Sequence, residues 1–94
     1  PARLDDAALQ AALASLPGWE VVDGALQKNF RFDDFDAAMA FATRVADVAR
    51  AEDHHPDMTV GWGRCMLRWS THDAGGLTAR DTRCAGLVDA LARP

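Results

Sequence analysis

The 94-residue sequence contains no tyrosine, a single lysine and only two cysteines. Cys65 and Cys84 are too few for a disulfide framework, and their spacing matches no zinc-binding motif. No apolar run approaches the roughly 20 residues that cross a bilayer, and no secretory apolar segment follows the first residues. We therefore expect a cytoplasmic protein that has no membrane partner and keeps both thiols reduced, as small core side chains.

Basic residues do not outnumber acidic ones in this chain. Fourteen acidic residues oppose ten basic ones, which gives a formal net charge of -4 and an isoelectric point near 5.1. Because a nucleic-acid-binding surface needs clustered lysine and arginine, this balance argues against a nucleic-acid partner. Apolar residues make up 49% of the chain and charged residues 26%, as in ordinary folded proteins. At this length we expect one domain, residues 1–94.

The first third of the chain predicts a helix followed by a hairpin. Residues 5–16 begin with two aspartates, carry leucines at helical spacing, and end at Pro17-Gly18. Residues 19–22 and 25–32 flank Asp23-Gly24, a strong turn signal, and the second of these segments alternates apolar and polar side chains.

The remainder repeats this order. Residues 33–50 open with two aspartates and carry an apolar stripe at three- and four-residue spacing, which predicts a longer helix. Apolar residues alternate over 58–62 and 65–69, which predicts a second hairpin with its turn at Gly63-Arg64. A last helix is expected after Thr78, where Asp81 stands at capping-box spacing.

This helix-hairpin-helix-hairpin-helix order predicts an α+β fold of two layers, a four-stranded antiparallel sheet with three helices packed on one face. The other face of such a sheet is open and polar, and its edges are exposed. Because a domain of this size has a small core, association with a second copy is favoured, and we expect a dimer.

Three histidines lie within one stretch of 19 residues and are the candidates for chemistry: His54, His55 and His72. Imidazole titrates near neutral pH and commonly transfers protons in catalysis. Side chains of adjacent residues point in different directions in extended chain, so His54 and His55 are expected to do different work. Acidic residues surround the group (Glu52, Asp53, Asp57, Asp73 and Asp81). The pattern indicates a histidine acid/base site of unknown substrate.

Other interpretations of these residues remain open. The histidines lack the spacing of common zinc sites, so we expect no metal, but they are also compatible with solvated loop residues. Asp81 suits a helix cap. Trp19 and Trp62 suit either the core or a wall against a planar ligand. Arg80 suits a solvated surface.

Residues 52–57 (EDHHPD), Trp62, Thr71-His72 and residues 75–78 followed by Asp81 resemble the pterin-4a-carbinolamine dehydratases. The resemblance extends through nearly the whole chain. It implies a lyase that dehydrates 4a-hydroxytetrahydrobiopterin, or a related pterin, to the quinonoid dihydropterin and so recycles the cofactor of aromatic amino-acid hydroxylases. It also implies the two-layer fold, no metal or cofactor, and a homodimer or homotetramer.

The resemblance assigns roles to individual positions. His54, His55 and His72 correspond to the catalytic set, in which His54 and His72 flank the C4a hydroxyl and His55 positions the substrate or its loop. The substrate-binding residues that it implies are Asp81, Trp62, Trp19, Arg80 and Glu52.

One position departs from the family pattern. The family often carries an acidic residue four positions before the first histidine, where this chain has Arg50. An alternative function is therefore a non-catalytic role, either as an assembly factor for ribulose bisphosphate carboxylase, which some similar bacterial proteins perform, or as another protein-interaction module. Because His54, His55, His72 and Asp81 are all present, an active dehydratase is the preferred interpretation.

Overall fold

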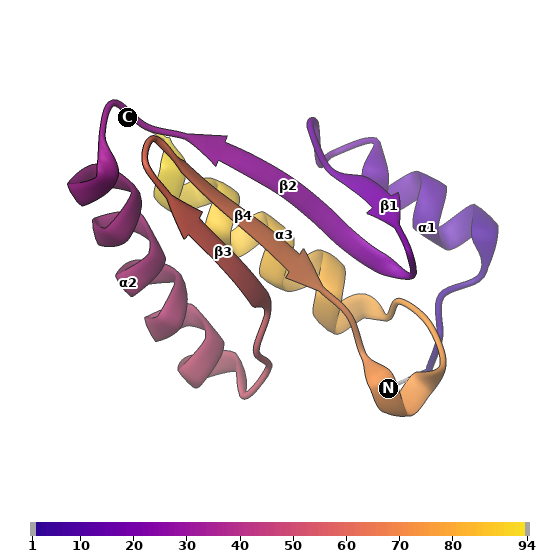
Figure 1. Ribbon diagram of the computed structural model, residues 1–94. Helices are drawn as coiled ribbons and strands as arrows, with labels where there is room; N and C mark the ends of the chain where they lie inside the picture. Colours follow the sequence, from indigo (N-terminus) through magenta and orange to yellow (C-terminus); the bar gives the residue numbers. More distant parts are fainter. Residues whose placement is uncertain (1, 94) are drawn as a thin grey trace.

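Within residues 2–93, the computed structural model contains three α-helices, one short 3-10 helix and four strands (Figure 1). In chain order these are α1 (Asp6–Leu13), β1 (Glu20–Val22), β2 (Ala25–Arg31), α2 (Phe35–Glu52), β3 (Asp57–Gly61), β4 (Arg64–Trp69), η1 (His72–Ala74) and α3 (Ala79–Ala92). The sheet order is β1-β2-β4-β3, and every neighbouring pair is antiparallel. The predicted α+β fold and its element order are confirmed.

The two faces of the sheet differ in character, as the alternation along the strands predicts. Leu26 pairs with Trp69, and Phe30 pairs with Cys65, so the inward side chains of β2 and β4 form one buried apolar layer. In Figure 1, α3 runs behind the sheet and α2 flanks it on the β3 side. Both helices pack on this layer, whereas α1 lies beside β1 and adds Leu9 and Leu13 to the margin of the core. None of the helices described between residues 2 and 93 combines the length and apolar character that crossing a membrane requires.

Several predicted boundaries differ from the observed ones by one to three residues, and two of these differences have a clear structural reason. The first helix ends at Leu13, and the buried Leu16 reaches the core from the following turn, because the chain tightens into turns before Pro17. The second hairpin turns at Trp62-Gly63, since Gly61 pairs with Arg64 across the strands. Gly63 adopts a left-handed conformation that favours glycine, and Trp62 is placed in the turn with 75% of its surface exposed.

The end of α2 fixes where the first histidine lies. Asp53 adopts a left-handed conformation with φ of +51°, and its N–H bonds to the Arg50 carbonyl. The N–H of His54 bonds back to the Ala49 carbonyl at 3.0 Å. These two bonds form a Schellman motif, which ends the helix and turns the chain abruptly away from its axis.

Several large apolar side chains remain exposed on α2 and on the adjoining β3 hairpin. Phe35 and Met39 lie on α2, and Met58 lies on β3, which is an edge strand of the sheet. An edge strand presents unpaired backbone groups that can pair with another chain. The homo-oligomer expected from the sequence stays a prediction.

Both thiols lie in the core. Cys65 projects from β4 and Cys84 from α3, and neither is bonded to another cysteine. Burial is the largest cause that raises the pKa of both thiols, and for Cys84 the value reaches about 11, with further contributions from Glu52 and Asp81. The protonated thiol is therefore the favoured form at neutral pH.

Substitutions at Asp53 test the left-handed end of α2. We expect Asp53→Gly to be more stable than Asp53→Ala by about 1–2 kcal/mol, because only glycine adopts this conformation without a steric penalty. Urea unfolding followed by tryptophan fluorescence measures the difference. The same pair of substitutions at Asp47, inside α2, should give the opposite order, since glycine weakens a helix interior. Equal stability of the two Asp53 variants would contradict the Schellman assignment.

Thiol labelling tests the burial of the cysteines. With Ellman's reagent at pH 8, we expect Cys84 of the folded protein to react more than about 100-fold more slowly than an ordinary thiol, because a pKa near 11 leaves little thiolate. Both cysteines should react promptly in concentrated guanidinium at the same pH. Rapid labelling of Cys84 without unfolding, located by mass spectrometry, would be inconsistent with this environment.

Candidate active site

A hollow of about 410 Å³ lies where the connection from α2 to β3 meets the segment after β4. Residues 53–57, residues 70–73 and Arg80 line it, and we call it the histidine hollow. All three histidines are among these residues, although at least 16 residues lie between His72 and the other two in the sequence. They come from two segments, the chain that leaves α2 and the short helix η1.

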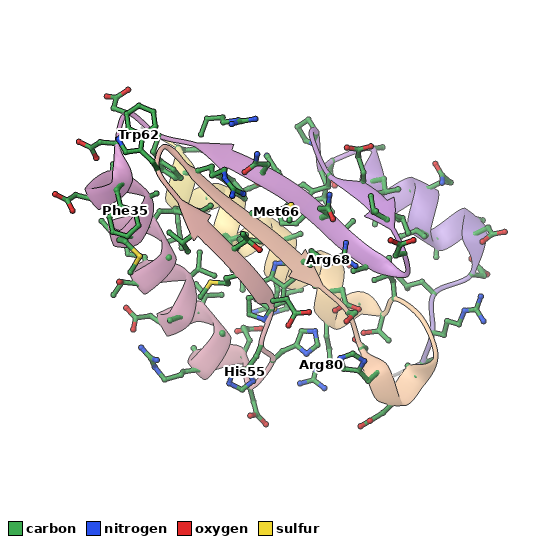
Figure 2. The ribbon with its side chains drawn as sticks, in the orientation of Figure 1. Phe35, His55, Trp62, Met66, Arg68 and Arg80 are labelled. Atoms are coloured by element: carbon green, nitrogen blue, oxygen red, sulfur yellow. The ribbon has the colours of Figure 1, made fainter. Side chains whose placement is uncertain are left out.

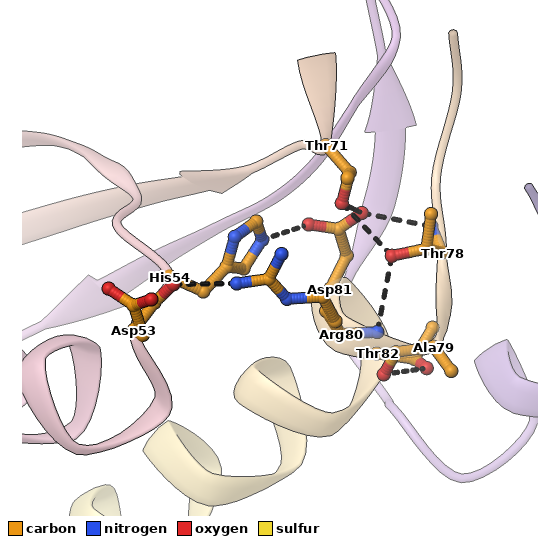
Figure 3. Close-up of polar contacts among 8 residues, drawn as sticks. All are labelled: Asp53, His54, Thr71, Thr78, Ala79, Arg80, Asp81 and Thr82. Carbon is orange, nitrogen blue, oxygen red and sulfur yellow. Dashed lines mark hydrogen bonds and ion pairs between the residues drawn. The ribbon is translucent and has the colours of Figure 1, made fainter. Parts of the chain in front are cut away.

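The centre of the site is a hydrogen bond between His54 and Asp81, the third residue of α3 (Figure 3). His54 Nε2 lies 2.6 Å from Asp81 Oδ1. The Asp81 side chain has no exposed surface, and His54 is only 8% exposed. Because a carboxylate oxygen accepts hydrogen bonds, Nε2 is the donor, and this leaves His54 Nδ1 as the nitrogen that is free for a ligand.

The second oxygen of Asp81 is held by two threonines (Figure 3). Oδ2 accepts a hydrogen bond from Thr71 Oγ1 at 2.7 Å and another from the backbone N–H of Thr78 at 3.0 Å. Thr71 has one hydroxyl proton and gives it to Asp81, so the Thr78 hydroxyl is the donor in the 3.0 Å contact between the two threonines. A buried carboxylate without such partners would be strongly disfavoured.

Asp81 therefore caps α3 and also contacts a histidine of the site. It completes the capping box of α3, in which Thr78 accepts from the first turn and Asp81 accepts from the N–H of Thr78. It also orients His54. The two roles are compatible because a carboxylate has two oxygens, one for the helix terminus and one for the imidazole.

The adjacent histidines occupy different environments, as their extended backbone predicts. The His54 ring is buried and stacks on Trp69, with ring centres 5.6 Å apart. His55 is exposed, and so is His72. The hollow thus has one histidine that is rigidly held and two that are accessible to solvent.

Arg80 is the one arginine among the residues that line the histidine hollow, and three of the other lining residues are aspartates. Its Nη2 donates to the backbone carbonyl of Asp53 at 2.6 Å, which ties the start of α3 to the chain that carries His54 (Figure 3). Figure 2 shows Arg80 and His55 at the same end of the molecule. Among the side chains between residues 2 and 93, no group of three His, Cys, Asp or Glu is arranged to hold a metal ion.

Three residues that the sequence suggested as substrate contacts lie outside this hollow. Trp62, in the turn after β3, is at the opposite end of the sheet from His55 (Figure 2). Trp19 is buried against Phe30 and donates its indole N–H to Asp89, about two helical turns beyond Asp81 on α3. Within one chain, neither tryptophan can serve as a wall of this hollow.

Glu52 is also directed elsewhere. Its Oε1 accepts a hydrogen bond of 2.6 Å from Arg83 Nε, and this pair links the end of α2 to α3. The hydrogen bond to Arg83 is the main cause that lowers the pKa of Glu52. Glu52 is the last residue of α2, and the chain turns at Asp53. Its side chain therefore stays between α2 and α3, where it contacts Arg83.

Thr71 is the residue of this site that the sequence analysis did not identify as a contact. A signal for it was present in the alternation of β4, where Cys65, Leu67 and Trp69 point inward. Continued by two residues, that alternation places Thr71 on the same inward face, although the strand has ended. An inward polar residue next to His72 needs a buried partner, and Asp81 is that partner.

Comparison with known proteins shows which family the chain resembles. Residues 2–91 match the family model described as pterin 4 alpha carbinolamine dehydratase. A Chromobacterium violaceum protein that carries the provisional name pterin-4-alpha-carbinolamine dehydratase is 46% identical over 90 residues, covering 96% of this chain and 83% of the relative. A relative of the same name from Thermomicrobium roseum is 45% identical, and the match covers 97% of this chain and 98% of the relative.

A solved structure has the same fold. The crystal structure of a transcriptional coactivator/pterin dehydratase from Brucella melitensis superposes with a TM-score of 0.91 at 33% identity, over 97% of this chain and 99% of that one. With the family model spanning nearly all of its length, the chain belongs to the pterin-4a-carbinolamine dehydratase family.

Proposed function

We propose that this protein dehydrates a 4a-hydroxytetrahydropterin to the quinonoid dihydropterin. The observation that carries the proposal is the buried His54–Asp81 pair at a hollow that His72 also lines, in a chain of this family. The names of the relatives support pterin as the substrate class. In this function the protein would regenerate the pterin cofactor of aromatic amino-acid hydroxylases.

The reaction needs one proton delivered and one removed. The bond between C4a and the hydroxyl oxygen breaks, and the oxygen leaves as water after it gains a proton. N5 loses its proton, and the electron pair left on N5 forms the C4a–N5 double bond. Two imidazoles near neutral pH, one protonated and one neutral, can divide these transfers, and each contributes typically ~10²–10⁴ in rate.

We assign the transfers to His54 and His72, and substrate positioning to His55. His54 is suited because Asp81 accepts a hydrogen bond from its Nε2 and so fixes the orientation and tautomer of the ring, while Nδ1 is left to exchange a proton with substrate. Arg80 and Asp81 serve as substrate-site residues in this proposal, Arg80 at the rim of the hollow and Asp81 through His54.

The position that departs from the family pattern does not alter the lining of the histidine hollow. Arg50 lies on an exposed side of α2 and pairs with Asp47 at 2.7 Å, in a contact between two well-exposed side chains. An exposed pair of this kind has little effect on stability. Arg50 therefore gives no structural reason to prefer the non-catalytic alternative.

Replacement of His54 and His72 tests the proposed function. With a 4a-hydroxytetrahydropterin generated in place and followed by ultraviolet absorbance, we expect acceleration by the native protein. Each alanine variant should lose roughly 10²–10⁴-fold in kcat, and the double variant should not exceed the spontaneous rate. The exposed Asn29→Ala serves as the matched control and should retain full activity. Folded native protein without any acceleration would favour the assembly-factor or interaction-module alternative.

Thr71→Val tests whether Asp81 positions His54. The substitution keeps the side-chain shape but removes the donor to Asp81, so the free energy of unfolding should fall by about 1.5–3 kcal/mol. We also expect a lower kcat and a changed pH–rate profile. Thr71→Ser should restore both. Thr43→Val, at an exposed threonine of α2, should change neither the stability nor the profile. An unchanged profile for Thr71→Val would mean that Thr71 acts only on stability.

A further inference from the structure

A second hollow, of about 340 Å³, adjoins the histidine hollow. It extends over the end of the open face of the sheet, between residues 23–25 of the β1–β2 turn and Gly75-Gly76. We call it the sheet hollow. The two hollows share Asp57 and residues 70–72, so His72 stands at their junction.

The floor of the sheet hollow includes part of a polar row across three strands. Arg68 of β4 lies between Gln27 of β2 and Asp57 of β3 in the strand register. The Nη1 of Arg68 donates to Gln27 Oε1 at 2.5 Å, which fixes the guanidinium and leaves other N–H groups for a ligand. Arg68 is shown on the viewer's side of the sheet in Figure 2.

The lining of the sheet hollow indicates the kind of group that it would take. It presents the N–H donors of Arg68, the carboxylate acceptors of Asp23 and Asp57, and the hydroxyl of Ser70. Its apolar lining is limited to small residues, so it offers no surface for a flat ring. A hydroxyl group both donates and accepts, and a short chain of hydroxyls therefore matches this mixture better than an anion or an apolar group.

The covalent structure of a tetrahydropterin allows one molecule to occupy both hollows. In a tetrahydropterin the variable side chain is attached at C6, which is bonded directly to N5, one of the two reacting atoms. If the ring reacts beside His72, its side chain must begin within a few bonds of His72, where the sheet hollow opens.

We propose that the sheet hollow binds the polyhydroxyalkyl side chain at C6 of the substrate, with Arg68 as a specificity-determining residue. This inference rests on the proposed dehydratase function, since it places the ring in the histidine hollow. It assigns to the polar face of the sheet a role in choosing among pterins.

The test compares two substrates that differ only at C6. One is the 4a-hydroxy derivative of tetrahydrobiopterin, which carries a dihydroxypropyl chain, and the other is that of 6-methyltetrahydropterin. For the native protein we expect kcat/KM to be higher for the dihydroxypropyl substrate. Arg68→Gln should reduce this preference by about 10- to 100-fold, the effect of losing a hydrogen bond to a charged group. Arg64→Gln is the matched control, because Arg64 is an arginine on the same strand and face but outside the hollow.

Equilibrium binding separates this inference from the proposed function. The unreactive 7,8-dihydrobiopterin and 6-methyl-7,8-dihydropterin are titrated calorimetrically, and Arg68→Gln should weaken binding of the first selectively. If neither 4a-hydroxy substrate is turned over by native protein, the proposed function fails whatever the binding data show. Equal use of both substrates by native protein, or an equal loss for both in Arg68→Gln, would overturn the assignment of the sheet hollow.

Discussion

The arrangement of the site depends on one buried carboxylate. Asp81 has no exposed surface, and its two oxygens are occupied by an imidazole, a hydroxyl and a backbone N–H. These donors come from the α2–β3 connection, the segment after β4, and the start of α3. A buried acceptor must be satisfied by fixed donors, so the position of each segment relative to the other two is restricted.

This constraint explains how a small domain can hold a precise site on connecting segments. The Schellman motif ends α2 and directs the chain toward Asp81, and Arg80 donates to the same turn from α3. Stacking on Trp69 also restricts the movement of the His54 ring. Loops are usually mobile, but these three contacts attach the histidine-bearing loop to the helical layer and to β4. The exposed His55 and His72 retain the freedom to meet a ligand.

Much of this could be predicted from particular features of the sequence. The alternation in β2 and β4 predicted which side chains would be buried, because a strand projects its residues to opposite faces. The capping-box spacing of Thr78 and Asp81 located the start of α3, and the pair His54-His55 was expected to diverge. The end of the first helix was misplaced by three residues and the second hairpin turn by one, since apolar spacing continues past the point where the backbone turns. The family resemblance placed Glu52 at the substrate together with His54, but the end of a helix lies between them.

The sequence by itself determined the elements, their order and the two faces of the sheet, because these depend on local periodicity and on turn residues. It also supplied the histidines and Asp81 as candidates. Only the tertiary structure decided that Asp81 meets His54 and Thr71, that Trp19 belongs to the core, and that Trp62 lies far from the histidines. The physical reason is that these outcomes depend on contacts between residues distant in the chain, and such contacts are set by how the layers pack rather than by any local pattern.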